Sequence, residues 1–377
     1  MSEWKKVKLG DVSQYVDDKI AIAATNESYY VSTDSMLKDK GGIIDPESIP
    51  LNGNVTRYQS DDILVSNIRP YFKKIWFSNR EGGCSNDVLV FRAQKYVTPR
   101  YLYYILSSNT FFEHMMAGAN GTKMPRGNKK LIMNYSFELP SLPTQHRIAT
   151  ILSRYDSLIE NYQKQIKLLE EAAQRLYKEW FVDLHFPGHE NTKIVEGVPE
   201  GWKKKKLGQL AEFKRGKTIT KKEAIEGSIP VVAGGLEPAY YCDKSNTTNR
   251  VITISGSGAN AGYTRMYFEK VWASDCSFAD TSTTDYLHFV FCFLQENKTV
   301  IDNMQKGAAQ PHVYAKDINS MELLLPIKKI LFLYEQRVSR FFDTIESLQS
   351  QISLLTEARD RLLPKLMGGE IKIESLN

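Results

Sequence analysis

The segment QIKLLEEAAQRL, residues 165–176, returns as QISLLTEARDRL at residues 351–362, and this repetition decides how the chain is organised. The two copies lie 186 residues apart and are identical at eight of their twelve positions. The identities include Glu171 with Glu357, and a hydrophobic core does not require the same charged residue twice. The sequence therefore indicates an internal duplication.

The duplication reaches well beyond this segment. Residues 121–140 align with residues 307–326 at the same offset, and WKKVKLGDV from Trp4 returns as WKKKKLGQL from Trp202 at an offset of 198. Because the two offsets differ, the middles of the two halves differ in length. Shared ends with divergent middles predict one scaffold that presents two different surfaces.

Each half ends in a stretch whose apolar residues recur at alternating steps of four and three, as in a coiled coil. In the first half these residues are Ile148, Leu152, Tyr155, Ile159, Tyr162, Ile166, Leu169, Ala173, Leu176 and Trp180, and in the second half they are Tyr334, Val338, Phe341, Ile345, Leu348, Ile352, Leu355, Arg359 and Leu362. Only Arg359 interrupts the apolar seam. Thr144 is predicted to cap the N-terminus of the first helix.

Two helices of about forty residues, each about 60 Å long, are predicted to pair with each other, because each seam must be buried. The globular segment between them permits either parallel or antiparallel pairing. A helical pair that serves only to dimerise the protein is the alternative.

The globular middles are rich in β-branched and aromatic residues bounded by Gly, Asn and Asp, which is typical of strands. Strands are predicted within residues 61–78, 84–93, 250–258 and 263–274, and short helices within residues 98–116 and 285–305. Each half is thus predicted to be a compact α+β domain followed by a long helix.

Composition narrows the class of protein. The 377 residues, 42% hydrophobic and 25% charged, suffice for two or three domains with their own cores. No run of eighteen apolar residues occurs, and the first residues, MSEWKKVKLGDVS, lack the apolar stretch of a signal peptide. We therefore expect a cytoplasmic protein that does not enter a membrane. The four cysteines form no CxxC pair and are expected to be buried, reduced thiols.

Three motifs resemble known sites but lack the context that those sites need. Gly256, Gly258 and Gly262 follow a predicted strand, but another strand and not a helix is predicted after them, so no dinucleotide site is expected. The stretch GQLAEFKRGKT lacks the first glycine of a phosphate-binding loop. His185 and His189 are separated by proline and glycine, which excludes the helix that would align them on a metal. With no methyltransferase or nuclease motif either, the sequence favours a non-catalytic binding protein.

The net charge of +5 and the pI near 8.7 are only mildly basic and do not by themselves identify a nucleic-acid-binding protein. The distribution of charge is more informative. Lys and Arg collect in VKLGDV, KKKKLGQLAEFKRGKTITKK, NIRPYFKK and GTKMPRGNKK, which mostly also contain polar or aromatic residues that can reach phosphates or base edges. For each run, an ordinary solvated surface is the alternative.

The sequence as a whole resembles the specificity subunit of type I restriction-modification systems. The segments LPTQHRIATILSRYDSLIENYQKQIKLLEEAAQRLYKEWFVD, GVPEGWKKKKLGQLAEF and RDRLLPKLMGGEI are similar to the central and C-terminal conserved regions of that family. The resemblance covers essentially the whole chain and includes motif order, duplication and length. The stretch LPIKKILFLYEQRV departs from the more usual LPxxxEQxxI pattern.

The resemblance implies two target recognition domains, residues 1–143 and 185–328, each reading one half of a split DNA sequence. It implies that antiparallel helices, residues 144–184 and 329–370, connect them and dock other subunits. The partners it implies are double-stranded DNA, two modification methyltransferase subunits and a restriction subunit. Adenosylmethionine and ATP are expected on those partners, and no cofactor is expected in this chain.

We expect Lys and Arg side chains to contact phosphates and polar side chains to discriminate bases in the major groove. The candidates are Arg69, Tyr71, Lys73, Lys74, Lys123, Arg126 and Lys129 in the first domain, and Lys217, Thr218, Ser257, Asn260, Tyr263, Arg265, Gln310 and His312 in the second. Two other functions stay open. A self-sufficient methyltransferase or nuclease would modify or cleave DNA alone, and a coiled-coil scaffold that binds only proteins would show no DNA sequence preference.

Overall fold

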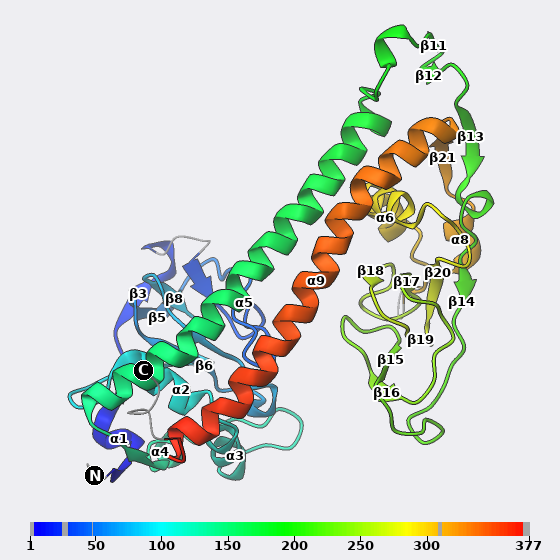
Figure 1. The fold of residues 1–377 in the computed structure, drawn as a ribbon. Helices are drawn as coiled ribbons and strands as arrows, with labels where there is room; N and C mark the ends of the chain where they lie inside the picture. The colour runs from blue at the N-terminus through cyan, green and yellow to red at the C-terminus, as the bar shows by residue number, and fades with distance from the viewer. Residues whose placement is uncertain (1–3, 25–28, 47, 308–310, 372–377) are drawn as a thin grey trace. The chain divides into compact units, whose positions relative to one another are not determined.

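The computed structural model describes residues 4–24, 29–46, 48–307 and 311–371. It divides into two compact units (Figure 1). Unit 1 consists of Met1–Glu160 with Ser353–Asn377, and unit 2 of Asn161–Ile352. Each unit contains one α+β domain, called here the first and the second domain, and a part of each of two long helices.

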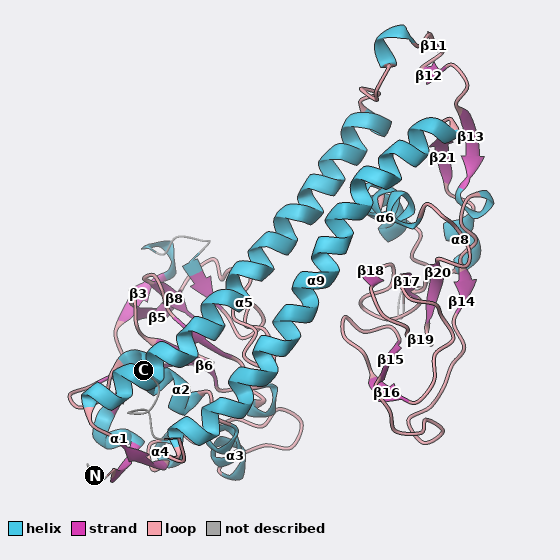
Figure 2. Ribbon diagram, viewed as in Figure 1, coloured by secondary structure: helices cyan, strands magenta, loops and turns pink. Residues whose placement is uncertain are grey.

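The long helices are α5, Leu142–Tyr177, which continues as a π-helical turn over Lys178–Val182, and α9, Lys328–Met367 (Figure 2). In unit 1 the beginning of α5 packs against the end of α9, where Ile148 shares a core with Leu366. In unit 2 the end of α5 packs against the beginning of α9, where the Tyr334 hydroxyl donates to the Ala173 carbonyl at 3.3 Å. The predicted helices and their antiparallel pairing are thus confirmed in each unit.

The start of α5 differs from the prediction. The helix begins at Leu142, so Thr144 lies inside its first turn and the predicted cap at Thr144 is wrong. Pro143 follows Leu142 in this turn. Proline has a fixed φ that suits the first turn of a helix, where its missing N–H costs nothing, so Pro143 is accommodated inside the first turn of α5.

None of the predicted seam residues is exposed, and the charged one has a specific partner. The Arg359 guanidinium lies 2.9 Å from the Asp156 carboxylate on α5, and Tyr104 donates its hydroxyl to the same carboxylate at 2.5 Å. Burial is the main reason why the pKa of Tyr104 is raised, and the adjacent Asp156 adds to it. The interruption of the seam is therefore an ion pair that ties both helices to the first domain.

We expect Arg359→Ala to lower the free energy of unfolding of unit 1 by about 2 kcal/mol, because it leaves the Asp156 carboxylate half-buried without its cation. Urea unfolding followed by circular dichroism measures the change. Arg361→Ala is the matched control, since Arg361 pairs with Glu357 on the exposed face of the same helix and exposed pairs contribute little. Equal effects of the two substitutions would contradict the role given to Arg359.

The two domains share the strand order of one of their two sheets. In the first domain, the antiparallel sheet β2-β9-β6-β7 comprises Ser13–Tyr15, Val88–Ala93, Ile63–Ser66 and Ile75–Phe77, and the sheet β3-β5-β8-β4 comprises Lys19–Ala21, Asn54–Tyr58, Gly82–Cys84 and Tyr30–Val31. In the second domain, the antiparallel sheet β14-β20-β17-β18 comprises Lys214–Arg215, Cys276–Asp280, Val251–Ser255 and Thr264–Tyr267, and the sheet β16-β15-β19 comprises Tyr240–Cys242, Ile229–Val232 and Trp272–Ala273. Both second sheets contain one parallel pair, β4 with β8 and β15 with β19.

The remaining elements frame these sheets. Two-stranded ladders join β1, Lys5–Lys8, to β10, Ser136–Leu139; β13, Lys203–Lys206, to β21, Glu322–Leu325; and β11, Ile194–Val195, to β12, Val198–Pro199. The short helices are α1, Leu9–Val12; α2, Pro99–Leu106; α3, Asn109–Ala117; α4, Lys129–Ile132; α6, Leu287–Glu296; α7, Lys298–Asn303; and α8, Ala315–Asn319. The predicted strands and short helices are confirmed.

Burial explains why the central strands hold the sheets together. Strands β6 and β17 are buried at every position and carry mainly Ile, Val and Leu, which favour a pleated, packed surface. Helix α2 joins the core of unit 1 and helix α6 the core of unit 2, and both cores include residues of the long helices. Each domain is thus packed onto its own part of the helix pair.

All four cysteines are free and buried, as expected from their spacing. Burial raises the pKa of Cys84, Cys276 and Cys292 to about 12, which leaves these thiols protonated at neutral pH. Within the described residues, no cluster of His, Cys, Asp and Glu could hold a metal ion. None of the described helices is long and apolar enough to cross a membrane.

Candidate nucleic-acid interface

In the first domain, the end of strand β6 meets a loop from much later in the chain. We call residues 67–69 with residues 120–127 the first loop pair. The loop closes on itself through two hydrogen bonds of 2.9 Å between the backbones of Asn120 and Arg126. It is then fixed to the strand end, because the Arg69 N–H donates to the Pro125 carbonyl at 2.8 Å.

The second domain contains the same construction. The second loop pair consists of residues 256–258 with residues 306–307 and 311–313. Lys306 and His312 exchange backbone hydrogen bonds of 3.0 and 2.9 Å, and the Gly258 N–H donates to the Pro311 carbonyl at 3.0 Å. These contacts repeat those of the first loop pair. In the later loop the equivalent residues lie 186 positions further along the chain, so that Pro311 takes the place of Pro125.

Backbone conformation agrees as closely as hydrogen bonding does. Arg69 and Gly258, which occupy equivalent positions, both have positive φ, at 49° and 82°. A non-glycine residue in this conformation is strained, so Arg69 is held there by its surroundings. The two loop pairs therefore have one backbone design, although most of their residues differ.

The side chains change in a compensating way. In the first loop pair the Asn67 side chain faces Gly127, where an added Cβ would lie 2.8 Å from Asn67 Oδ1. In the second, Gly256 takes the place of Asn67 and Val313 that of Gly127, and the equivalent backbone bonds are 3.2 and 3.1 Å. The larger side chain thus lies at the strand end in the first loop pair and on the later loop in the second, and the backbone hydrogen bond between the two positions is kept.

Each loop pair also contacts an aspartate that directly precedes the neighbouring strand of the sheet, β9 in the first domain and β20 in the second. The Asn67 N–H donates to the Asp87 carbonyl at 2.8 Å and the Gly256 N–H to the Asp275 carbonyl at 3.0 Å. The Asp87 carboxylate lies 3.2 Å from the Arg126 guanidinium. The Asp275 carboxylate instead accepts a hydrogen bond from the Ser257 hydroxyl. The equivalent aspartates thus have different partners: Asp87 orients a guanidinium in the first loop pair, and Asp275 orients a neutral hydroxyl in the second.

Two polar atoms of the first loop pair are buried without a hydrogen-bond partner among the described residues, Asn67 Oδ1 and Arg69 Nε. Leaving such atoms unpaired costs roughly 1–3 kcal/mol each. Arg126 is exposed beside them. The accessible group of the first loop pair is therefore the oriented Arg126 guanidinium, a donor that suits phosphates and base edges, and it lies beside these two buried atoms.

The other candidates of the first domain lie in several surroundings. Tyr71 is 47% exposed on a 3-10 turn, Pro70–Phe72, that follows Arg69. Lys73 donates to Asn109 Oδ1 at 2.9 Å. Lys74 is half-buried and donates to the Thr33 carbonyl at 2.6 Å, and its pKa is lowered mainly by burial, so it points into the domain. Lys123 and Lys129 are exposed.

The candidates of the second domain are also divided. Ser257 and His312 belong to the second loop pair, and Asn260 follows it and donates to the Gly234 carbonyl at 3.4 Å. Tyr263 and Arg265 instead line a cleft beside the long helices. Lys217 and Thr218 are exposed on the segment after β14. Gln310 lies outside the described residues.

Sequence reasoning did not single out Asn67, Asp87, Asp275 or Arg215. Arg215 lies with Gly256, Asp275 and His312 around a small cavity of about 40 Å³. Asn67 and Asp87 could have been found in the sequence as polar residues that directly flank buried strands, after β6 and before β9. Their meeting with residues 120–127 depends on the tertiary structure and had no local signal.

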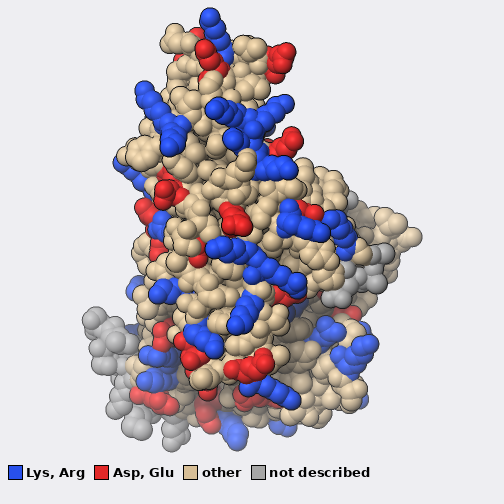
Figure 3. Space-filling view, turned by 90° about the vertical axis from the view of Figure 1, so that its right-hand side faces the viewer, with Lys and Arg blue, Asp and Glu red and all other residues tan. Residues whose placement is uncertain are grey.

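Charge alone does not mark out the interface. Figure 3 shows the face of the molecule on which β13 and β14 lie, and basic side chains spread over it with acidic ones between them. Strand β13 consists of four lysines, three of them exposed. Because the face is mixed in sign, the loop pairs and not a continuous basic patch are the best-defined candidate surfaces.

Two α+β domains that share one sheet order, each with its own loop pair and its own part of a helix pair, define a protein with two related candidate surfaces. Residues 1–171 and 199–357 match the family model described as the type I restriction modification DNA specificity domain. The chain belongs to this family.

Named relatives and a solved structure agree with this assignment. The chain is 28% identical over 305 residues to the type I restriction enzyme MjaIX specificity subunit of Methanocaldococcus jannaschii, covering 74% of this chain and 71% of that one. It is 21% identical to the HindI specificity subunit of Haemophilus influenzae, over 98% and 100% of the two chains. The fold resembles the S subunit of a type I restriction-modification system from M. genitalium, with a TM-score of 0.55, 17% identity, and coverage of 97% and 96%.

Proposed function

We propose that this chain is the DNA-recognition subunit of a type I restriction-modification complex in which each loop pair contacts one half of a bipartite DNA target. Its family is that of DNA specificity domains. The observation that carries the proposal is the duplicated loop-pair backbone with different side chains. The same backbone hydrogen bonds hold the loops in both domains, and different side chains on this repeated backbone would select different bases.

A change in the first loop pair should alter only one half of the target. We expect Arg126→Ala to weaken or relax recognition at one position of that half, with occupancy falling 10- to 100-fold, since a good base contact contributes about 1–3 kcal/mol. Sequencing of methylated bases in a host that carries this chain with its methyltransferase subunit gives the readout. Arg57→Ala is the control, because Arg57 pairs with Glu81 on the exposed surface of the same domain. Unchanged methylation with Arg126→Ala, or loss in both halves, would overturn this reading.

The proposed partners besides DNA are a restriction subunit and two copies of the methyltransferase subunit. Support for two copies comes from the outward face of the repeated helical segment. Leu168 is 64% exposed on α5, and its equivalent on α9, Leu354, is 62% exposed. The same ion pair follows each of them, Glu171 with Arg175 and Glu357 with Arg361.

Exposed residues do not have to match for the helices to pack, so the matching face points to one kind of partner bound twice. The face defined by Leu168, Glu171 and Arg175, with its copy on α9, is called here the repeated face. Adenosylmethionine and ATP are assigned to the partner subunits, and the complex acts in the cytoplasm, where the DNA is.

A further inference from the structure

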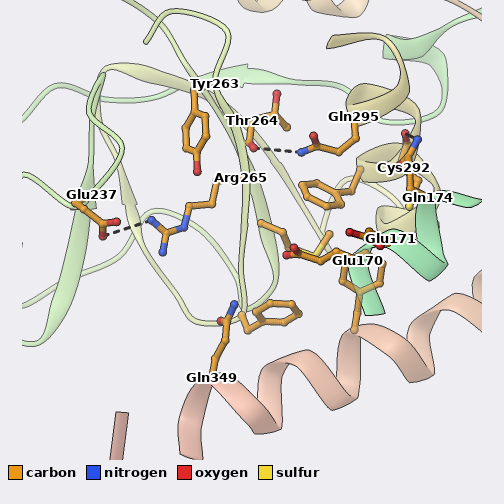
Figure 4. A pocket seen from close by; sticks show the side chains of 14 residues that line it. Glu170, Glu171, Gln174, Glu237, Tyr263, Thr264, Arg265, Cys292, Gln295 and Gln349 are labelled. Carbon is orange, nitrogen blue, oxygen red and sulfur yellow. Dashed lines mark hydrogen bonds and ion pairs between the residues drawn. The ribbon is translucent and has the colours of Figure 1, made fainter. Parts of the chain in front are cut away.

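Unit 2 contains a cleft of about 600 Å³ between the second domain and the two long helices, shown in Figure 4. Its lining combines three carboxylates with aromatic and amide side chains. The residues are Glu170, Glu171, Gln174, Glu237, Tyr263, Thr264, Arg265, Met266, Phe268, Phe291, Cys292, Gln295, Phe342 and Gln349. The cleft lies apart from the second loop pair, none of whose described residues is in its lining.

The three carboxylates differ in how they are neutralised. Glu237 lies 3.5 Å from the Arg265 guanidinium, as Figure 4 shows, and Glu171 lies 3.6 Å from Arg175. Glu170 has no ion pair or hydrogen bond with any residue that the structure describes. Its side chain is exposed, but the protein around it displaces part of its water, and this partial desolvation raises its pKa. A partly desolvated carboxylate without a counter-ion gains stability from any cation placed beside it.

Unit 1 shows what occupies the corresponding place in the other half. There Lys40, whose side chain is only 12% exposed, lies 4.0 Å from the Asp360 carboxylate on α9. Asp360 is the duplicate of Gln174, which lines the cleft in unit 2. The backbone N–H groups of Asp39 and Lys40 donate to the carbonyls of Phe72 and Lys73, which precede β7, the counterpart of β18. A lysine of the first domain therefore fills this position in unit 1.

The described lining of the cleft contains no lysine in the place of Lys40, and the one cation that the second domain puts there, Arg265, is paired with Glu237. Lys40 comes from the segment after β4, and the segment after the corresponding strand, β15, places Glu237 at the cleft instead. The helices also differ between the two units. Arg359 of unit 1 corresponds to the smaller Ala173 in unit 2, and Asp156 of unit 1 corresponds to the apolar Phe342. The cleft of unit 2 is thus the open counterpart of a position that is filled in unit 1.

We propose that the cleft of unit 2 receives a lysine or arginine side chain of the methyltransferase subunit, so that the two bound copies of that subunit are held unequally. The inference rests on the proposed function. Glu171 belongs both to the cleft lining and to the repeated face, so the cleft is continuous with the surface on which that partner docks. The rings of Phe268, Phe291 and Phe342 suit the aliphatic stem of a basic side chain and can add a cation–π contact. DNA is a poor occupant, because its phosphates would face the carboxylates.

The test measures binding of the methyltransferase subunit to the full chain by native mass spectrometry over a range of subunit concentrations. The wild-type chain is expected to bind two copies with different affinities. Glu170→Lys should weaken one of the two copies by about tenfold or more and leave the other unchanged, and Glu170→Gln should do the same to a smaller degree. Glu179→Lys is the control, since Glu179 is exposed on the turn after α5 and does not line the cleft. Circular dichroism confirms that each variant is folded.

The outcomes separate this inference from the proposed function. Two copies bound equally well by the wild-type chain and by both Glu170 variants would overturn the cleft proposal and leave the proposed function intact. Failure of the wild-type chain to bind any methyltransferase subunit would overturn both. A small cation such as spermidine is the other possible occupant. If spermidine bound in a Glu170-dependent way while neither variant changed the affinity for the methyltransferase subunit, the cleft would be a small-cation site and the proposal would be overturned.

Discussion

Replacement of residues 5–140 by the corresponding domain of a relative with a different target should change one half of the methylated sequence completely and leave the other half as it was. The physical reason is that each loop pair is built within one domain, from a strand end and a loop that contact each other directly. In the first domain, Asn67, Arg69 and Arg126 all lie within the exchanged segment. Sequencing of methylated bases across the host genome reports both halves in one experiment.

The reciprocal exchange of the second domain is the matched control. It should change the other half only, because Ser257 and His312 of the second loop pair, and Asp275 that accepts the Ser257 hydroxyl, all belong to the second domain. If either exchange altered both halves together, the two-reader interpretation would be wrong. Loss of all methylation with a folded, partner-bound chimera would also contradict it.

Charge placed on the repeated face should remove the methyltransferase subunits one at a time. We expect Leu168→Glu and Leu354→Glu each to leave a complex with one subunit, and the double variant to bind none, with affinity at least 100-fold lower at each altered position. Burial of a leucine side chain contributes about 1.5–3 kcal/mol, and a carboxylate buried in its place without a partner adds a further penalty. Native mass spectrometry of the mixed subunits counts the copies directly.

Leu158→Glu tests whether any exposed leucine of α5 would give the same result. Leu158 is 43% exposed, but its duplicate on α9 is Thr344, so it does not belong to the repeated face. This variant should bind two subunits normally. A double variant of Leu168 and Leu354 that still bound two subunits would show that the repeated face is not the docking surface.

The sequence by itself determined the duplication, the α+β class of each half and the two long helices. These features are expressed in local patterns: the heptad spacing of α5 and α9, the β-branched strands β6 and β17, and repeated segments at a fixed offset. A periodic pattern reports which face of an element is buried, whatever it is buried against. For the same reason the sequence could not explain Arg359, whose partner Asp156 lies 203 residues away.

Only the tertiary structure decided which polar residues meet. NIRPYFKK reads as one basic cluster, but the fold sends Lys74 inward to the Thr33 carbonyl and keeps Arg69 beside Pro125. Arg265 looks like a DNA contact in the sequence, yet its guanidinium turns to Glu237 in a cleft beside the long helices. The loop pairs are made by segments more than fifty residues apart in the first domain and about fifty apart in the second, joined by backbone hydrogen bonds that carry no signature in residue type. Contacts between distant segments follow from chain topology, because a strand end acquires its neighbours only when the sheet and the helices around it have formed.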